Sequence, residues 1–377
     1  MLSLALPLVL AAAPNPSVSV LFSGDVTLGY HYEEYVDEQV SKGGKKDELI
    51  GWGFQQVKPV TTKADLFVVN LECPFTDRGA KIPKNFNFRA RPELSAALAA
   101  GGVDVASIAN NHMMDYGPEG LFDTVSALDT LGVAHFGAGR TLAEARAPAI
   151  VEKKGLTFAF LGYFFLGDRN IEPREVIATA ERPGVAGDFS DRPAMKAMVD
   201  ADVRAAKQRA DHVIPFFHWG REGTTQPEPY QVELAHAAID AGAAAVIGSH
   251  PHVLQGIEVY QGRPIAYSLG NFVFGGNWNP RDKRTALLEL RFDAKGVARV
   301  TVVPAYSDAY PEVPVQPYLA EGEKADAVLD HLAAISAQFP RTIPQLVARR
   351  TKPRPEAGGA SETTKPARAS SPDAGPR

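Results

Sequence analysis

Two histidines flank a proline in the segment AVIGSHPHVLQG, residues 245–256. The apolar run before them, residues 243–247, predicts a short buried strand that ends just ahead of His250 and His252. Histidines at positions i and i+2, held by a proline, can both turn into one cleft, and imidazole is a common metal ligand. A lone histidine at a strand end is more often structural. The metal interpretation therefore requires ligand-type side chains at the ends of other strands.

Ligand-type side chains do follow four other apolar runs. They are Asp25 after residues 18–24, Glu72 at the end of 65–72, Asn110, Asn111, His112 and Asp115 at and beyond the end of 103–110, and His218 near the end of 212–220. Singly, each has a structural explanation, such as a turn cap at Asp25 or an Asx-turn at Asn110 and Asn111. Together, three imidazoles, two carboxylates and an amide are a ligand set for a divalent transition metal. A shared carboxylate could bridge two ions.

The elements that position these groups alternate between strand and helix patterns. Helices are predicted to begin at Pro92, Pro118, Pro193 and Pro229, because proline favours the first helical turn. Tight glycine-containing turns predict hairpins over residues 149–163, 256–270 and 286–303. This order predicts an α/β fold with a mixed sheet, or two stacked sheets, covered by helices, and such sheets carry chemistry at the carboxyl ends of their strands. We expect Phe164, Phe165, Phe216 and Phe217 to lie in the core.

Composition limits the class of protein. The chain has 377 residues, 45% hydrophobic and 22% charged, which is ordinary for a soluble protein with one large domain or two closely associated ones. Its net charge of −5 lacks the excess of basic residues that is typical of nucleic-acid-binding proteins, so we expect no nucleic-acid partner. Cys73 is the only cysteine, which excludes an internal disulfide bond.

The two ends of the chain differ in character from the part between them. The run MLSLALPLVLAAAP is too short to span a bilayer and resembles the apolar part of a signal peptide, although no basic residue precedes it and Pro14 follows its alanines directly. We therefore expect residues 1–16 to be a signal-like segment of an exported protein, periplasmic or attached to the cell surface, with an uncleaved anchor or a mis-assigned start as the alternatives. Residues 350–377 lack aromatic, Ile, Leu and Val residues and predict a disordered Pro/Ala/Ser-rich tail. The folded domain is then expected over residues 17–345.

Six sequence blocks carry a resemblance to a known family. They are GDVTLG, NLE, ANNHMMDYGPEGLFDT, HWGRE, GSHPHVLQGIEV and AYSLGNFVF, in this order over residues 24–274. The set resembles the signature blocks of the CapA, or poly-γ-glutamate capsule synthesis, family, which is itself similar to the calcineurin-like metallophosphoesterases. The resemblance implies a metallophosphoesterase-like four-layer sandwich, with two mixed β-sheets packed between helices.

The resemblance also implies roles for individual residues. The implied metal ligands are Asp25, Glu72, Asn111, His218, His250 and His252. Thr27 stands where the phosphoesterases have a ligand histidine, and Glu72 replaces their bridging aspartate. One metal site would keep Glu72, Asn111, His218 and His250; the other would keep Asp25, Glu72 and His252, with at best a weak hydroxyl from Thr27. We expect one tight site for a divalent transition metal (Mn, Zn or Fe) and a second site that is weak or absent.

Further residues are candidates for catalysis and substrate binding. The resemblance places His112 opposite the leaving group, and Asp115 would orient its imidazole if the intervening turn is helical; otherwise Asp115 only caps the turn before Gly117. Glu222, Arg89 and Asn271 are candidates to line the cleft and contact substrate, with a surface salt bridge as the alternative for Arg89.

Three functions remain open at this point. The first is an exported metal-dependent hydrolase or transferase of the cell envelope that acts through a metal-activated water on poly-γ-glutamate, a related acidic polymer or a small anionic substrate. The alternative is a non-catalytic protein that binds the polymer or a capsule synthase complex. The same fold could also carry an unrelated small-molecule phosphodiesterase activity. Thr27 favours the binding protein, and the His112–Asp115 pair favours the enzyme.

Overall fold

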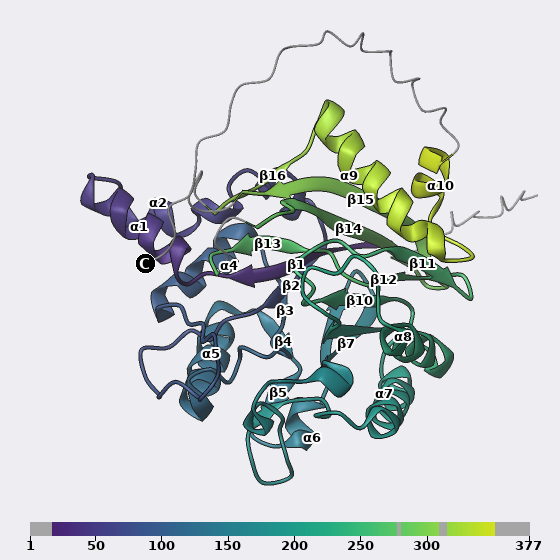
Figure 1. Ribbon diagram of the computed structural model, residues 1–377, viewed down its shortest axis with the longest axis horizontal. Coiled ribbons are helices and arrows are strands. Elements are labelled where there is room, and N and C mark those ends of the chain that lie inside the picture. The colour runs from purple at the N-terminus through teal and green to yellow at the C-terminus, as the bar shows by residue number, and fades with distance from the viewer. Residues whose placement is uncertain (1–16, 277–279, 309–314, 351–377) are drawn as a thin grey trace, which may run out of the picture.

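Strand β1 (Val18–Thr27) lies in the middle of the larger of two central sheets in the computed structural model, which describes residues 17–276, 280–308 and 315–350 (Figure 1). The expected signal-like segment 1–16 and tail residues 351–377 lie outside the described residues. The larger sheet has the order β16-β15-β14-β1-β2-β3-β4, with β13 also paired to β1. Its other strands are β2 (Leu66–Leu71), β3 (Val105–Ser107), β4 (Ala134–Phe136), β13 (Asn271–Phe274), β14 (Arg284–Asp293), β15 (Gly296–Ser307) and β16 (Pro317–Leu319).

The second sheet has six strands in the order β11-β12-β10-β9-β7-β6. They are β6 (Ala149–Lys153), β7 (Leu156–Phe165), β9 (His212–Trp219), β10 (Val246–Ser249), β11 (Ile257–Tyr260) and β12 (Arg263–Ala266). A small separate pair joins β5 (Ala138–Gly139) to β8 (Gly184–Val185). Parallel pairs dominate the centre of both sheets, because β1, β2 and β3 run parallel, as do β7, β9 and β10.

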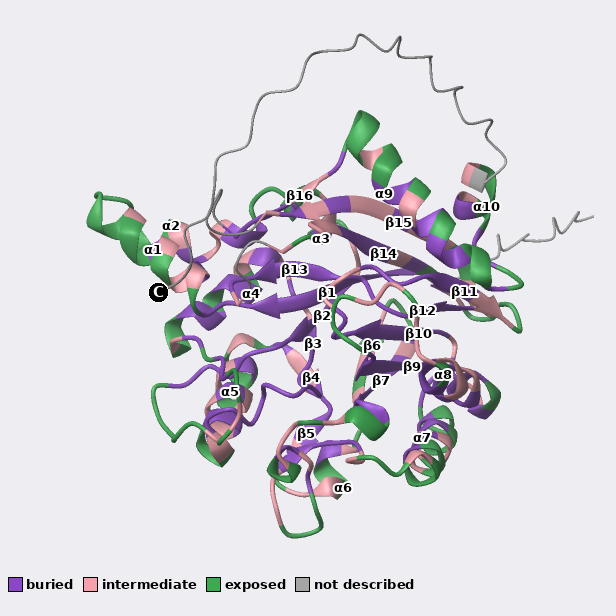
Figure 2. Cartoon of the chain, in the orientation of Figure 1, coloured by how far each residue is buried: buried purple, intermediate pink, exposed green. Residues whose placement is uncertain are grey.

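Three buried clusters define four layers. The cluster between the sheets takes alternate residues of β1, such as Val20 and Phe22, and of β9, such as Ile214 and Phe216. The other face of each sheet is covered by helices, whose inward sides are buried and outward sides exposed (Figure 2). The larger sheet is covered by α1 (His31–Ser41), α2 (Lys46–Ile50), α3 (Lys58–Thr61), α4 (Ala96–Gly101) and α5 (Gly117–Leu131); the smaller by α6 (Leu142–Ala145), α7 (Arg192–Lys207) and α8 (Pro229–Ala241). The expected four-layer sandwich is confirmed.

Two further helices close one end of the interface between the sheets. Helix α9 (Gly322–Ile335) packs on β14 and β15 and contributes to the central cluster, and α10 (Pro344–Arg350) packs on α9. Thr342, between them, donates a 2.6 Å hydrogen bond to the carbonyl of Ile257 and so ties this end to β11. No helix in the described ranges is both long and apolar enough to cross a membrane.

Most of the predicted elements form, with different boundaries. The three hairpins appear as β6–β7, β11–β12 and β14–β15, and the four phenylalanines expected in the core are buried. Strand β1 continues past Gly24 to Thr27 because β13 pairs with it in parallel at Asp25. Strand β3 ends at Ser107 and not at Asn110, whose side chain bonds instead to Asn70 and to the carbonyl of Leu71. At Pro92 a 3₁₀ turn precedes α4.

A close approach between Gly24 and Gly270 places β13 beside β1. A Cβ atom at Gly24 would lie 1.7 Å from the carbonyl oxygen of Gly270, the atom that accepts a 3.0 Å hydrogen bond from the backbone N–H of Asp25. Only glycine permits this contact, and it sets the position of the Asp25 carboxylate.

We expect Gly24→Ala to lower the free energy of unfolding by about 1–3 kcal/mol, the usual cost of overpacking, because a backbone carbonyl cannot move aside as a side chain can. Urea denaturation measures the loss. Ser23→Ala, a small change on the same strand, is the control and should cost much less. Equal stability of the two variants would show that the backbone relaxes freely here.

Candidate metal centre

The predicted ligands meet where the carboxyl ends of both sheets adjoin. The larger sheet supplies Asp25 from β1, Glu72 just after β2 and Asn111 from the turn after β3. The smaller sheet supplies His218 from β9, and His250 and His252 just after β10. Parallel strands bring their carboxyl ends to one edge of a sheet, so the residues come together although they span more than half of the chain.

The side chains form three overlapping groups that could each hold a metal ion. Within each group, the potential ligand atoms lie within 4.8 Å of one another. The groups are Glu72, His218 and His250; Asp25, Glu72 and His252; and Glu222, His250 and His252. The first two reproduce the two sites expected from sequence, with Glu72 common to both. The amide oxygen of Asn111 lies 2.8 Å from Nε2 of His218 and so adjoins the first group.

The bonding state of Glu72 fits a bound cation. Glu72 is fully buried, and among the described residues neither of its carboxylate oxygens has a hydrogen-bond partner. Nδ1 of His250 is also buried without a partner there. A buried carboxylate without a partner is costly, and the nearest imidazole nitrogens, Nε2 of His218 and of His252, are 3.6 and 3.8 Å from Oε1. These distances leave the oxygens free for a cation.

The backbone at the two histidines is held in an unusual conformation. His250 has φ 96° and His252 has φ 58°, both in the left-handed region that favours glycine. The intervening Pro251 accepts a 2.8 Å hydrogen bond from Gly223, and the N–H of His250 lies 3.4 Å from Oδ2 of Asp25. Strained backbone of this kind persists only where surrounding contacts enforce it, and it concentrates at functional sites.

The protonation of the histidines differs between the two groups. Burial lowers the pKa of His218 and of His250 well below its usual value, and neighbouring histidines lower it further, so both are neutral and able to bind metal at pH 7. Burial also lowers the pKa of His252, but Glu72 and Asp25 more than offset this and raise it to about 10. Burial and the proximity of Asp25 raise the pKa of Glu72. His252 therefore supplies positive charge to the second group when no cation is bound there.

A pair of hydrogen-bonded side chains adjoins the predicted metal ligands. Nδ1 of His112 lies 2.6 Å from Oδ2 of Asp115, so the two side chains pair as expected and Asp115 does more than cap the turn. The ring of Phe88 stacks on His112 with centroids 4.1 Å apart, and its backbone N–H donates a 2.5 Å hydrogen bond to Asp115. Burial lowers the pKa of His112 and raises that of Asp115 to about 7. With Nδ1 engaged, Nε2 is the ring nitrogen available to a substrate.

Several contributors to the site had not been expected. Asn70 donates from Nδ2 to Asp25 at 2.9 Å and lies 3.2 Å from Nδ1 of His218, and the hydroxyl of Ser249 is also 3.2 Å from that nitrogen. These contacts orient the ligands, as outer hydrogen bonds commonly do in metal sites. Asn70 belongs to the NLE block, so the sequence did contain a signal that could have identified it as part of the site. Lys84 and Glu172, described below, come from loops without any such pattern.

The residues predicted to bind substrate lie in different places. Glu222 is exposed at the cavity and within reach of His250 and His252, which suits a metal ligand as well as a substrate contact. Asn271 is buried, and its Oδ1 lies 2.9 Å from Nδ1 of His252. This contact orients the imidazole of His252. Arg89 is exposed with its guanidinium 4.7 Å from the centre of the Tyr116 ring and is not among the cavity-lining residues. Thr27 uses its hydroxyl to donate to the carbonyl of Glu72.

One cavity of about 600 Å³ opens over the site and reaches Asn111, His112 and His250. Arg169 and Arg221 line it, and within the described ranges neither guanidinium forms an ion pair or side-chain hydrogen bond. Two apolar residues of the lining, Phe86 and Ile171, are 68% and 81% exposed. The cavity therefore combines two guanidinium groups with exposed apolar contacts, and the carboxylates of Glu172, Glu222 and Glu228 also line it.

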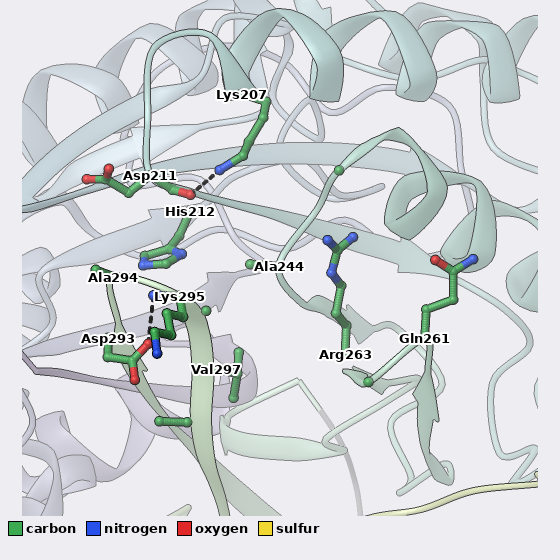
Figure 3. Close-up of a pocket in the computed structure, with 14 residues that line it drawn as sticks. Lys207, Asp211, His212, Ala244, Gln261, Arg263, Asp293, Ala294, Lys295 and Val297 are labelled. Carbon is green, nitrogen blue, oxygen red and sulfur yellow. Dashed lines mark hydrogen bonds between the residues drawn. The ribbon is translucent and has the colours of Figure 1, made fainter.

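A second cavity, of about 370 Å³, lies at the other end of the β9 strand, near the turn between β14 and β15 (Figure 3). Three of its charged side chains have local partners: Lys207 donates to the carbonyl of Asp211, Arg263 to that of Ile239, and Asp293 accepts from the N–H of Lys295. None of the three ligand groups found in the described residues lies there. This cavity does not compete as the functional site.

Two mixed sheets packed between helices, with ligand-type side chains from the carboxyl ends of both, define an α/β sandwich protein with a candidate metal centre. Residues 19–276 match the family described as "Bacterial capsule synthesis protein PGA_cap", and the chain belongs to this family. The capsule biosynthesis protein CapA of Bacillus anthracis is 33% identical over 77% of this chain and 67% of that protein. The PGA biosynthesis protein CapA of Bacillus subtilis is 34% identical over 76% and 71%.

More distant matches include a Mycobacterium tuberculosis protein described as a probable polyglutamine synthesis accessory protein, 34% identical over 59% of each chain. A solved structure described as a novel phosphatase from Mycoplasma pneumoniae has 12% sequence identity and a TM-score of 0.46, covering 79% of this chain and 96% of that one. A structural likeness at this level defines no activity.

We expect a second metal ion to bind more tightly as the pH rises. A cation at Asp25, Glu72 and His252 must displace the proton from His252, so affinity should increase up to pH about 10. The raised pKa also stabilises the metal-free fold below about pH 6.5, and this contribution is lost as the pH rises through about 10. Metal analysis at a buffered free Zn²⁺ concentration should show about one ion per chain near neutral pH and more near pH 9. A pH-independent ratio would contradict this assignment.

Proposed function

We propose that the protein is an exported metal-dependent hydrolase or transferase of capsule metabolism, acting on poly-γ-glutamate or a related acidic polymer. The observation that carries the proposal is Glu72, a buried carboxylate with two unpartnered oxygens common to two ligand groups. Membership of the capsule synthesis family supports the polymer, and the apolar segment at residues 1–16 supports export.

The proposed cofactor is a divalent transition metal such as Mn, Zn or Fe. Glu72, His218, His250 and Asn111 would hold one ion, and Asp25, Glu72 and His252 would hold the weaker second. Such an ion supplies Lewis-acid polarisation of an ester or amide oxygen and lowers the pKa of water. The mixture of imidazole, carboxylate and amide ligands suits these metals.

The proposed role of His112 is proton donation from Nε2 to the leaving group. Asp115 fixes the ring through Nδ1 and stabilises the imidazolium, while the Phe88 ring restricts its orientation. The pKa of His112 is lowered by burial in the free protein. An anionic substrate would raise it, because opposite charge favours the protonated ring.

Arg169 and Arg221 are proposed to bind the acidic polymer in place of Arg89. Their guanidinium groups lack carboxylate partners within the described ranges and line the same cavity as His112. Phe86 and Ile171 would contact the methylene groups between the charges of such a chain.

A non-catalytic polymer- or synthase-binding protein is the second candidate. It is favoured by Thr27, whose hydroxyl is bonded to the Glu72 carbonyl where the phosphoesterases carry a ligand histidine. The binding protein would use the same cavity and arginines but would not need His112.

We expect His112→Ala to lower kcat by about 10²–10⁴ with metal content unchanged, the range for general acid–base groups. Asp115→Asn should lose less, because Asp115 only orients and tunes the imidazole. Activity on a panel of phosphodiesters and γ-glutamyl amides, measured beside metal content and melting temperature, tests this. If the wild-type protein is inactive on all of these substrates, the enzyme hypothesis is contradicted and the hypothesis of a non-catalytic binding protein is left.

We expect the double variant Arg169→Gln/Arg221→Gln to bind poly-γ-glutamate at least about tenfold more weakly at low salt, because two charge contacts are lost. Arg204→Gln/Arg291→Gln, which removes the same charge from exposed positions on α7 and β14, is the control and should change little. Equal weakening in both double variants would show that net charge, and not this cavity, attracts the polymer.

A further inference from the structure

We infer that Glu172, held by Lys84, positions the metal ligand Asn111 by fixing which end of its amide faces the metal ligands. The inference rests on the proposed metal site and assigns two residues outside the ligand set to it. It concerns the affinity of that site for a cation, which can be measured without any enzymatic activity.

An asparagine ligand is ambiguous in a way that a carboxylate is not. Its amide has an oxygen, which can bind a cation, and an NH₂ group, which cannot. Rotation of the amide by half a turn exchanges the two ends with little change in shape. A metal site that uses asparagine therefore needs an interaction that distinguishes oxygen from nitrogen.

The contacts of Asn111 supply this distinction. Its Nδ2 donates a 3.0 Å hydrogen bond to Oε1 of Glu172, and its Oδ1 lies 2.8 Å from Nε2 of His218. An ionised carboxylate only accepts hydrogen bonds, so Glu172 binds the NH₂ end and repels the oxygen. The reversed amide would lose this bond and turn two N–H groups toward the ligand nitrogens and the cation.

Glu172 is itself held firmly in place. Nζ of Lys84 lies 2.8 Å from Oε2 of Glu172, and the two side chains are only 6% and 11% exposed. The backbone N–H of Glu172 also donates a 3.0 Å hydrogen bond to the side chain of Asn170. Lys84 fixes the carboxylate and Asn170 fixes the backbone of Glu172, so Oε1 is presented to Asn111 in one direction.

Lys84 extends the same network to the His112–Asp115 pair. Its Nζ donates to the carbonyl of Asn111 at 2.9 Å and lies 3.0 Å from Oδ1 of Asp115. One buried ammonium group therefore contacts the backbone of the metal ligand, the carboxylate that orients it and the partner of His112. Three segments distant in sequence are joined at this atom.

The test measures the affinity of the metal-depleted full-length protein for Zn²⁺ by calorimetry. Glu172→Ala should weaken the tighter site by about 10–100-fold, the usual effect of losing an outer hydrogen bond to a metal ligand. Glu175→Ala, which removes the same charge from an exposed position on the same loop, is the control and should bind as the wild type does.

Asn111→Asp separates amide orientation from other effects of Glu172. Both oxygens of aspartate can bind a cation, and Glu172 would repel the one that faces it, so Glu172→Ala should cause no further loss of affinity in the Asn111→Asp background. A loss from missing charge or from local unfolding would persist in that background, because neither depends on the amide.

Three outcomes would overturn the inference. Wild-type affinity in Glu172→Ala would show that the amide needs no orienting partner, and equal losses in both backgrounds would show that Glu172 acts by charge or stability. If the wild-type protein does not bind Zn²⁺, the proposed metal site itself is contradicted. This outcome is distinguishable from the two variant outcomes because the wild-type protein is measured before any substitution is made.

Discussion

The buried carboxylate of Glu72 is the constraint on which the site depends. Its two oxygens lie at the junction of the two sheets without a hydrogen-bond partner in the described residues, surrounded by imidazoles from β9 and the loop after β10. An unpaired charge there would oppose folding. The charge is absent when Glu72 is protonated, and it is balanced when a protonated His252 or a bound cation lies beside it. The raised pKa of His252 is the direct result of this arrangement.

The two-sheet architecture explains how such a site can be assembled. One sheet supplies the candidate oxygen ligands, from Asp25, Glu72 and Asn111, and the other supplies the three histidines. The glycine contact between β1 and β13 fixes the oxygen side, and the left-handed residues around Pro251 fix part of the nitrogen side. Two local backbone features thus help to set the relative positions of the ligand-type atoms.

The sequence predicted which ligand-type side chains meet between the sheets better than it predicted their hydrogen-bond partners, and the reason is physical. Strand ends carry a pattern, because an apolar run followed by a polar residue is visible locally, and Glu72, His218 and His250 all lie at such ends. The four-layer arrangement rested on resemblance, since no local pattern specifies how two sheets stack. Lys84 and Glu172 come from loops whose course is set by tertiary contacts, so their meeting with Asn111 had no local signal. Arg89 had a suitable charge, but the chain turns its side chain onto Tyr116.

The division of the ligands between two sheets has a consequence for the stability of the whole protein. An ion bound by Glu72 from one sheet and by His218 and His250 from the other is a cross-link between the two halves of the sandwich. Binding energy for such an ion is available to folding, and at a free ion concentration about 100 times the dissociation constant it amounts to about 2.7 kcal/mol. The proposed ion would thus make the amount of folded protein depend on the supply of metal where folding takes place.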